Sequence, residues 1–305
     1  MNLLANKPMS GHITEAIVHF NYALDLKYRH SSSVDVAQAM FNALNKLQTE
    51  WLMNQSEQQI GEVKAFQAMI LSGLPLQSRD AFLQTTQTRS IVTLEPKILN
   101  HDTLRRGGYK PDVPVDPRLA KDASEAHRKL ETAYRDLEQV GTDEVSERVI
   151  KRLAELLYVV RSNIAHGEKT LYGPDLNKRE RDEQVCACAV PLQELLLDML
   201  FGLPSRKLIS YGTLAPGQPN HSLISDLIGE WEECVIRGTM SQRDGLSRFS
   251  WNPNGSEQIA NIFSSDNLPN NWDRIDRFEG AGYRRQLIPT RTQAGIAIGY
   301  AYVNV

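Results

Sequence analysis

Residues 202–217 read GLPSRKLISYGTLAPG, and the sequence changes character within them. Before this stretch, apolar residues recur at the three- and four-residue spacing of amphipathic helices. After it, short runs rich in β-branched and aromatic residues are separated by Asn, Pro and Gly, which is typical of strands joined by turns. The change predicts a domain boundary, with an all-α domain over 1–203 and a domain rich in strands over 204–305. A chain of 305 residues is long enough for two such domains.

The upstream part predicts a helical bundle. The strongest pattern covers residues 144–166, where apolar side chains repeat along one helical face. Ser33 closes a run of three serines and is the expected N-cap of an early helix. Residues 74–118 are ambiguous, and the cluster GGYKPDVPVDP within them indicates a loop. The expected helices cover residues 11–28, 33–53, 56–72, 119–140, 144–166 and 179–201.

Composition narrows the class of protein. The net charge is −3, so the chain as a whole does not offer the broad basic surface typical of nucleic-acid binding. The cysteines Cys186, Cys188 and Cys234 form no CxxC pair, so we expect neither a disulfide framework nor a zinc site. No apolar run approaches the roughly 18 residues of a membrane span. We therefore expect a cytoplasmic protein that does not engage a membrane.

The first candidate site segment is Tyr211, Gly212, Thr213 and Leu214, which directly follows a predicted strand. A strand that ends in a glycine-bearing turn can point several backbone N–H groups in one direction. Such a nest binds a carboxylate or an oxyanion. The alternative is an ordinary turn from strand to loop.

The second segment, residues 272–280, reads WDRIDRFEG. Ile275 and Phe278 are three apart, so they can anchor one face of a short helix. Glu279 then lies at the end of that helix, beside an aromatic ring. Partial desolvation raises the pKa of such a carboxyl group and suits it to general acid/base work. The alternative is a surface carboxylate at a helix end.

Together the two segments resemble the γ-glutamylcyclotransferase superfamily. The pattern is YGTL-x-x-G-x-x-NH near the start of the domain, then ID-x-FEG-x-x-Y-x-R, then a closing strand with paired tyrosines. The resemblance implies a small mixed β-barrel with short helices, a cavity at the YGTL loop, and Glu279 as acid/base. It also implies that Tyr302 could line the cavity in place of Tyr300. The expected substrate-binding residues are Tyr211, Gly212, Thr213, Leu214, Tyr283 and Tyr300.

The implied reaction converts γ-glutamyl amides or amines to 5-oxoproline and a free amine. The α-amine attacks the side-chain carbonyl, so the substrate itself supplies proximity. One carboxylate can take the amine proton and return it to the leaving nitrogen, while backbone N–H groups of residues 212–214 stabilise the oxyanion. No metal or organic cofactor is required. The family often has a basic residue where this chain has Ala215 and Pro216, which leaves a domain that only binds its ligand as an alternative.

The helix predicted over 144–166 closes with Arg161 and His166, and Gly167 follows. This Arg-x4-His motif in a helical domain is similar to the HEPN superfamily. The resemblance implies a dimerising helical bundle, often a metal-independent ribonuclease, in which His166 is acid/base, Arg161 stabilises phosphate and Asn163 orients His166 or contacts RNA. Residues five apart on a helix point ~140° from each other, so a homodimer would complete the site. The alternative is that both residues only favour the negative end of the helix dipole.

These observations lead to three hypotheses of function. The first is a cyclotransferase with Glu279 as acid/base, joined to a HEPN-like dimerising domain. The second is a HEPN-type ribonuclease of a bacterial toxin–antitoxin or defence system, whose C-terminal domain is a regulator or sensor. The third is a scaffold that binds without catalysis.

Overall fold

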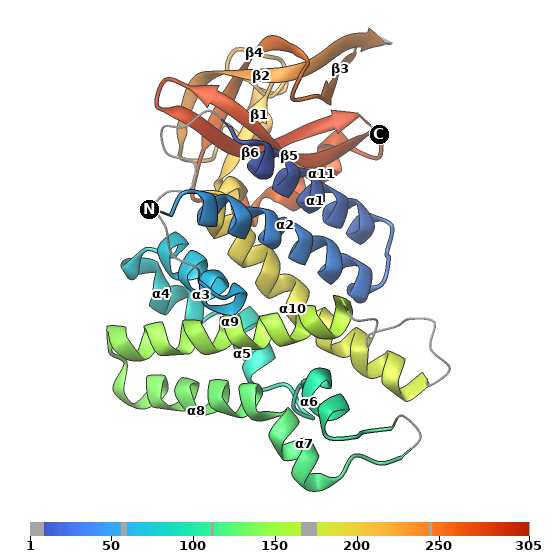
Figure 1. Ribbon diagram of the computed structural model, residues 1–305. Coiled ribbons are helices and arrows are strands. Elements are labelled where there is room, and N and C mark those ends of the chain that lie inside the picture. Colours follow the sequence, from blue (N-terminus) through green and yellow to red (C-terminus); the bar gives the residue numbers. More distant parts are fainter. Residues whose placement is uncertain (1–8, 56–59, 111–112, 166–175, 244–245, 305) are drawn as a thin grey trace. The chain divides into compact units, whose positions relative to one another are not determined.

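The computed structural model describes residues 9–55, 60–110, 113–165, 176–243 and 246–304. These form two compact units (Figure 1). The helical unit covers Tyr22–Leu197, and the barrel unit combines the chain up to Asn21 with Asp198–Val305. The chain therefore passes from one unit to the other within two helices, α1 (Gly11–Tyr28) and α10 (Leu176–Leu200).

The helical unit confirms the predicted all-α character of the upstream part. Its core contains side chains such as Leu44, Leu153 and Leu157, which repeat at helical spacing and are fully buried or nearly so. Besides parts of α1 and α10, its helices are α2 (Ser33–Met53), α3 (Glu62–Gly73), α4 (Leu76–Leu83), α5 (Thr86–Val92), α6 (His101–Arg106), α7 (Pro117–Ala123), α8 (Glu125–Val140) and α9 (Asp143–Ala165).

Four details differ from the sequence-based expectation. The helix predicted over 56–72 begins only at Glu62. The N-cap of α2 is Ser32 rather than Ser33, because the Ser32 hydroxyl accepts the Asp35 amide at 3.1 Å. The helix predicted over 119–140 is divided at Ser124 into α7 and α8. The ambiguous segment 74–118 holds α4, α5 and α6, whose six to eight residues complete barely two turns.

The barrel unit contains a closed barrel of five strands, and this barrel is mixed, as the family resemblance implies. The strands run in the order β2-β4-β1-β6-β5, and β5 pairs back onto β2 through Val235 and Arg291. The β1–β6 pair is parallel and the other pairs are antiparallel, while β3 extends the sheet beyond β2. The strands are β1 (Lys207–Ser210), β2 (Glu230–Arg243), β3 (Leu246–Trp251), β4 (Ser256–Ser264), β5 (Tyr283–Thr292) and β6 (Gly295–Asn304).

Short helices lie between these strands. They are the 3₁₀ turns Pro204–Arg206, His221–Leu223 and Leu268–Asn270, and the α-helix α11 (Trp272–Glu279). Gly280 follows α11 with φ of +69°, a conformation that glycine adopts without steric cost, so the helix ends directly after Glu279. The turn thereby fixes where the candidate catalytic carboxylate stands.

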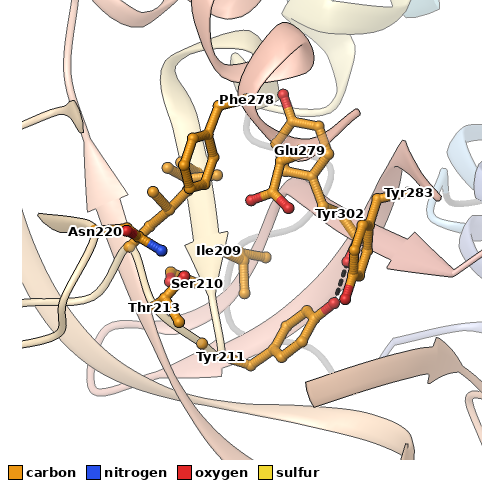
Figure 2. Close-up of a pocket in the computed structure, with 12 residues that line it drawn as sticks. Ile209, Ser210, Tyr211, Thr213, Asn220, Phe278, Glu279, Tyr283 and Tyr302 are labelled. Carbon is orange, nitrogen blue, oxygen red and sulfur yellow. Dashed lines mark hydrogen bonds between the residues drawn. The ribbon is translucent and has the colours of Figure 1, made fainter. Parts of the chain in front are cut away.

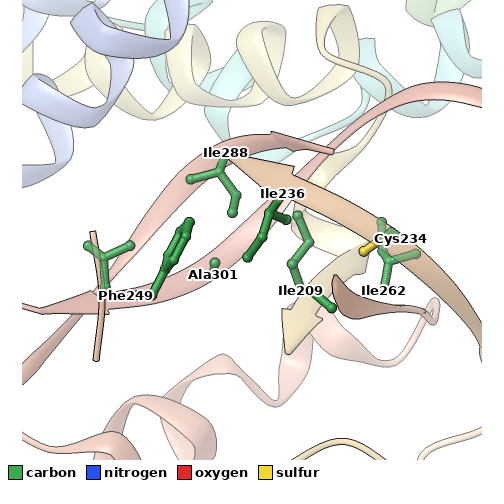
Figure 3. Packing of buried hydrophobic residues seen from close by; sticks show 9 residues of the cluster. Ile209, Cys234, Ile236, Phe249, Ile262, Ile288 and Ala301 are labelled. Atoms are coloured by element: carbon green, nitrogen blue, oxygen red, sulfur yellow. The ribbon is translucent and has the colours of Figure 1, made fainter. Parts of the chain in front are cut away.

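Alternate side chains of the strands fill the barrel interior (Figure 3). Period-two patterning sends every second residue inward. Ile236, Phe249 and Ile288 are completely buried there and Ile209 is 1% exposed, so four different strands share one core. This core holds the end of β1, where the loop of the candidate site begins.

The first part of α1 belongs to the barrel unit. Asn21 is buried, and its side chain acts on β5 as a neighbouring strand would. Its amide nitrogen donates to the Leu287 carbonyl at 2.8 Å, and its oxygen accepts the Leu287 amide at 2.7 Å. Phe20 packs edge-on against Phe201 at a centroid distance of 6.1 Å.

Among the described residues, no helix has both the length and the apolar character needed to cross a bilayer.

Candidate active site

The barrel unit has a cavity of about 250 Å³ beside the carboxyl end of β1 (Figure 2). The loop after β1 forms one wall, and the end of α11 faces it, with tyrosines from β5 and β6 between them. All the site residues expected in this domain except Tyr300 meet here. The lining residues are Leu208, Ile209, Ser210, Tyr211, Gly212, Thr213, Leu214, Asn220, Phe278, Glu279, Tyr283 and Tyr302.

Internal hydrogen bonds hold the loop after β1 in a tight turn. The Ala215 amide donates to the Gly212 carbonyl at 3.2 Å, and the Asn220 amide donates to the Thr213 carbonyl at 3.0 Å. His221 Nδ1 lies 3.0 Å from the Leu214 carbonyl, which requires that this nitrogen carry the proton. The carbonyls of residues 212–214 are thus engaged within the loop.

Unlike these carbonyls, the backbone amide groups of Gly212, Thr213 and Leu214 have no hydrogen-bond partner among the described residues. All three residues line the cavity. Unused backbone donors beside a cavity can bind a carboxylate or the oxyanion of a tetrahedral intermediate.

Glu279 extends its carboxylate into the cavity from the last position of α11 (Figure 2). Trp272 and Ile275 anchor the helix on its buried face, while Phe278 remains 42% exposed beside the cavity. Burial, together with the smaller effect of the nearby negative charge of Asp276, raises the pKa of Glu279 from 4.5 to about 7. The group can therefore hold or release a proton near neutral pH.

Two tyrosines connect the loop to α11. The Tyr211 hydroxyl donates to the Tyr302 backbone carbonyl, and the Tyr302 hydroxyl donates to Asp276 Oδ1 at 2.5 Å. Burial raises the pKa of both phenols, so they stay protonated near neutral pH. Since each phenolic proton is already engaged, the Tyr211 oxygen can only accept a hydrogen bond from a ligand.

Of the two tyrosines that the sequence offers, Tyr302 lies in the cavity lining and Tyr300 lies outside it. The Tyr300 ring is 7% exposed and packs edge-on against Trp272 at 5.4 Å. The Arg285 guanidinium lies over both rings, 5.2 Å from the centre of Tyr300 and 4.6 Å from that of Trp272. Tyr300 therefore stabilises α11 by packing against Trp272 and does not face the cavity.

Sequence reasoning did not assign roles to Ser210, Asn220 or Asp276. Asn220 lies in the cavity wall and is the Asn of the NH pair that closes the first motif, so the motif carried a signal for it. Asp276 belongs to the second motif in the same way. Ser210 is the last residue of β1 and has no comparable signal.

Of the pair Arg161 and His166 expected to form a site in the helical unit, the structure describes only Arg161. His166 and Gly167 lie outside the described residues, so the expected Arg161–His166 pair has no described geometry. Arg161 is half-buried, forms an ion pair with Glu62 at 3.6 Å and lies over the ring of Tyr158. The guanidinium is thus engaged within its own unit.

Asn163, expected to orient His166 or contact RNA, lies in the interior of the helical unit. Its side chain is 2% exposed. The amide oxygen accepts the His101 amide at 3.1 Å, and the amide nitrogen donates to the Leu99 carbonyl at 2.8 Å. Asn163 therefore fastens the segment before α6 to α9 and offers no surface to a nucleic acid.

No protein-family model and no curated protein matches the chain. Solved structures match about a third of it. YkqA from Bacillus subtilis is 24% identical with a TM-score of 0.28, over 32% of this chain and 35% of that one. An AIG2-like protein from Mus musculus is 17% identical with a TM-score of 0.28, over 33% of this chain and 77% of that one. An uncharacterised protein from Pyrococcus horikoshii is 19% identical with a TM-score of 0.25, over 32% and 76%.

Proposed function

We propose that the barrel unit is a γ-glutamylcyclotransferase-type enzyme. It would convert γ-glutamyl amides or amines to 5-oxoproline and a free amine, with Glu279 as general acid/base. One observation carries the proposal: a carboxyl group with a pKa of about 7 faces unused backbone donors across a cavity of about 250 Å³. The motif resemblance of the same segments supports it.

The site can perform each step of the ring closure. The Glu279 carboxylate takes a proton from the substrate α-amine as the nitrogen bonds to the γ-carbonyl carbon. The amides of Gly212, Thr213 and Leu214 can stabilise the resulting oxyanion. When the bond to the leaving amine breaks, Glu279 returns the proton to that nitrogen. The ring closure is intramolecular, so the protein mainly has to hold the extended γ-glutamyl chain in a folded form.

The hydrogen-bonding pattern also suggests how the substrate lies. The Tyr211 oxygen can only accept, and Glu279 is acidic, so this side of the cavity favours the amine end. Neutral donors for the α-carboxylate are the Thr213 hydroxyl, the Asn220 amide group and any loop amide that the oxyanion does not use. None of the described residues that line the cavity is basic. Carboxylate recognition would therefore depend on the loop geometry.

The test is to incubate the protein with a panel of γ-glutamyl dipeptides and γ-glutamyl amines and to measure 5-oxoproline. Glu279→Gln should lower kcat/KM by at least ~100-fold, because it removes the acid/base group. Asp273→Asn, the same kind of change on an exposed position of α11, should retain wild-type activity. The wild-type kcat/KM should decline below a midpoint of about pH 7, because the base must be ionised.

Two results would contradict the proposal. One is the absence of 5-oxoproline from every substrate, which would favour a domain that only binds its ligand. The other is equal activity of Glu279→Gln and the wild type. Circular dichroism of both variants, in the far and near ultraviolet, separates loss of chemistry from loss of fold.

A ribonuclease activity of a HEPN-like homodimer remains a separate prediction from the sequence. It requires that His166→Ala abolish RNA cleavage and any growth toxicity, and that the protein be dimeric by light scattering. Equal RNA cleavage by wild type and His166→Ala, or a monomeric protein, would reject it.

A further inference from the structure

Asp276 lies one turn before Glu279 on α11, on the same side of the helix. Each of its carboxylate oxygens has a partner. Oδ1 accepts the Tyr302 hydroxyl at 2.5 Å, and Oδ2 lies 3.4 Å from an Arg285 guanidinium nitrogen. The Asp276 side chain is 30% exposed and that of Arg285 is 21% exposed, so bulk water screens the pair only in part.

These contacts join the elements that surround the cavity. Arg285 belongs to β5, and its guanidinium stacks on the rings of Trp272 and Tyr300. Tyr302 belongs to β6, and its carbonyl accepts the hydroxyl of Tyr211 from the loop after β1. Asp276 thus links α11 to β5, to β6 and, through Tyr302, to that loop.

Among the described residues, two charged side chains and three tyrosines surround the Glu279 carboxylate. Asp276 supplies a negative charge from the same helix, and Arg285 supplies a positive charge paired with Asp276. The phenols of Tyr211, Tyr302 and Tyr283, from the loop, β6 and β5, complete the surroundings. The partly buried Tyr211 phenol and the buried Tyr302 phenol stay protonated and neutral near neutral pH. Asp276, itself paired with Arg285, is therefore the charged group that acts on the Glu279 carboxylate.

We propose that Asp276 is a positioning residue, which holds Glu279 over the cavity through Tyr302 and Arg285 and makes its proton affinity depend on the Asp276–Arg285 ion pair. Its consequence for catalysis rests on the proposed cyclotransferase function. Its effect on Glu279 itself does not, because proton affinity can be measured without any reaction.

The test measures the titration of Glu279 directly. The protein is labelled with glutamate carrying ¹³C at the side-chain carboxyl, and the Glu279 signal is identified by its loss in Glu279→Gln. Asp276→Asn keeps an acceptor for the Tyr302 hydroxyl and removes the charge, so the titration midpoint should fall by about one pH unit. Arg285→Gln leaves the Asp276 charge unbalanced, so the midpoint should rise.

Two further variants make the result specific. Arg285→Lys keeps the positive charge, so the midpoint should return toward the wild-type value. Asp273→Asn removes a charge from the exposed side of α11 and should leave the midpoint nearly unchanged, because solvent screens that position. The inference is overturned if Asp276→Asn and Arg285→Gln leave the midpoint unmoved, or if both move it in the same direction.

Kinetics then separate this inference from the proposed function. If the protein forms 5-oxoproline, the acid limb of kcat/KM should shift with the midpoint in each variant. If 5-oxoproline is absent while the midpoints shift in opposite directions, the cyclotransferase proposal fails and the inference about Asp276 stands. If activity is present and the midpoints do not move, the opposite holds.

Discussion

At Glu279, burial has opposite effects on the proposed reaction and on folding. Its pKa rises from 4.5 to about 7 in the folded chain, so the folded state binds the proton more tightly than the unfolded state. The stabilisation by the bound proton is fully present below pH ~4.5 and is lost as the pH rises through 7. The position that makes the carboxyl group a useful base therefore lowers the stability of the fold when the base is ionised.

Replacing Glu279 with Gln should accordingly stabilise the protein under alkaline conditions. At about pH 8 the variant should unfold with a free energy on the order of 2 kcal/mol higher than the wild type, and the difference should shrink toward pH 5. Urea unfolding at several pH values measures this, with Asp273→Asn as the control for a lost charge on α11. A variant that is no more stable than the wild type at pH 8 would contradict the partly buried, desolvated position of the Glu279 carboxyl group.

The sequence supports the prediction of some site residues because their signals are local. Glu279 and the loop 211–214 each stand in a short motif with a readable turn or helix end. The choice between Tyr300 and Tyr302 is not local, since both point to the α11 side of β6. It depends on how far along β6 the end of α11 lies, and only the packing of Trp272 and Arg285 decides that.

At the scale of the elements, the long helices could be predicted closely and the short ones could not. Helices α1 and α2 have the expected bounds because several turns repeat the apolar pattern. Helices α4 to α6 repeat it too few times to be recognised. The break at Ser124 between α7 and α8 could not be predicted, because no Pro or Gly lies there to indicate a helix end.

The attachment of α1 to β5 was also invisible to local patterns, because Asn21 and Leu287 lie 266 residues apart. The two hydrogen bonds between Asn21 and Leu287 should contribute substantially to the free energy of unfolding. Asn21→Ala leaves the buried amide and carbonyl of Leu287 without their partners, which should cost roughly 2–4 kcal/mol. Asn42→Ala is the matched control, because among the described residues the Asn42 side chain accepts a hydrogen bond only from Gln38 on its own helix, and it is half-buried. Urea unfolding that shows equal losses for both would refute the strand-like role of Asn21.

At the scale of the whole molecule, the chain was expected to contain a helical part and a mixed barrel, and it contains both. What a linear pattern could not supply is the closure of the barrel. Strands β2 and β5 meet through a single residue pair, Val235 and Arg291. Two other contacts support this seam: the Thr290 hydroxyl donates to the Val235 carbonyl at 3.0 Å, and Glu257 pairs with Arg237 and Arg291 at 2.9 Å each.

These two contacts should differ in strength because they differ in burial. Thr290 is 2% exposed, so Thr290→Val, which keeps the shape and removes the hydroxyl, should lower the free energy of unfolding by about 1 kcal/mol at any salt concentration. Glu257 and its arginine partners are largely exposed, so Glu257→Gln should change stability little, and that change should vanish at high salt. Chemical unfolding at low and high salt compares the two. If Glu257→Gln were the more damaging variant, surface charge rather than the buried hydroxyl would close the barrel.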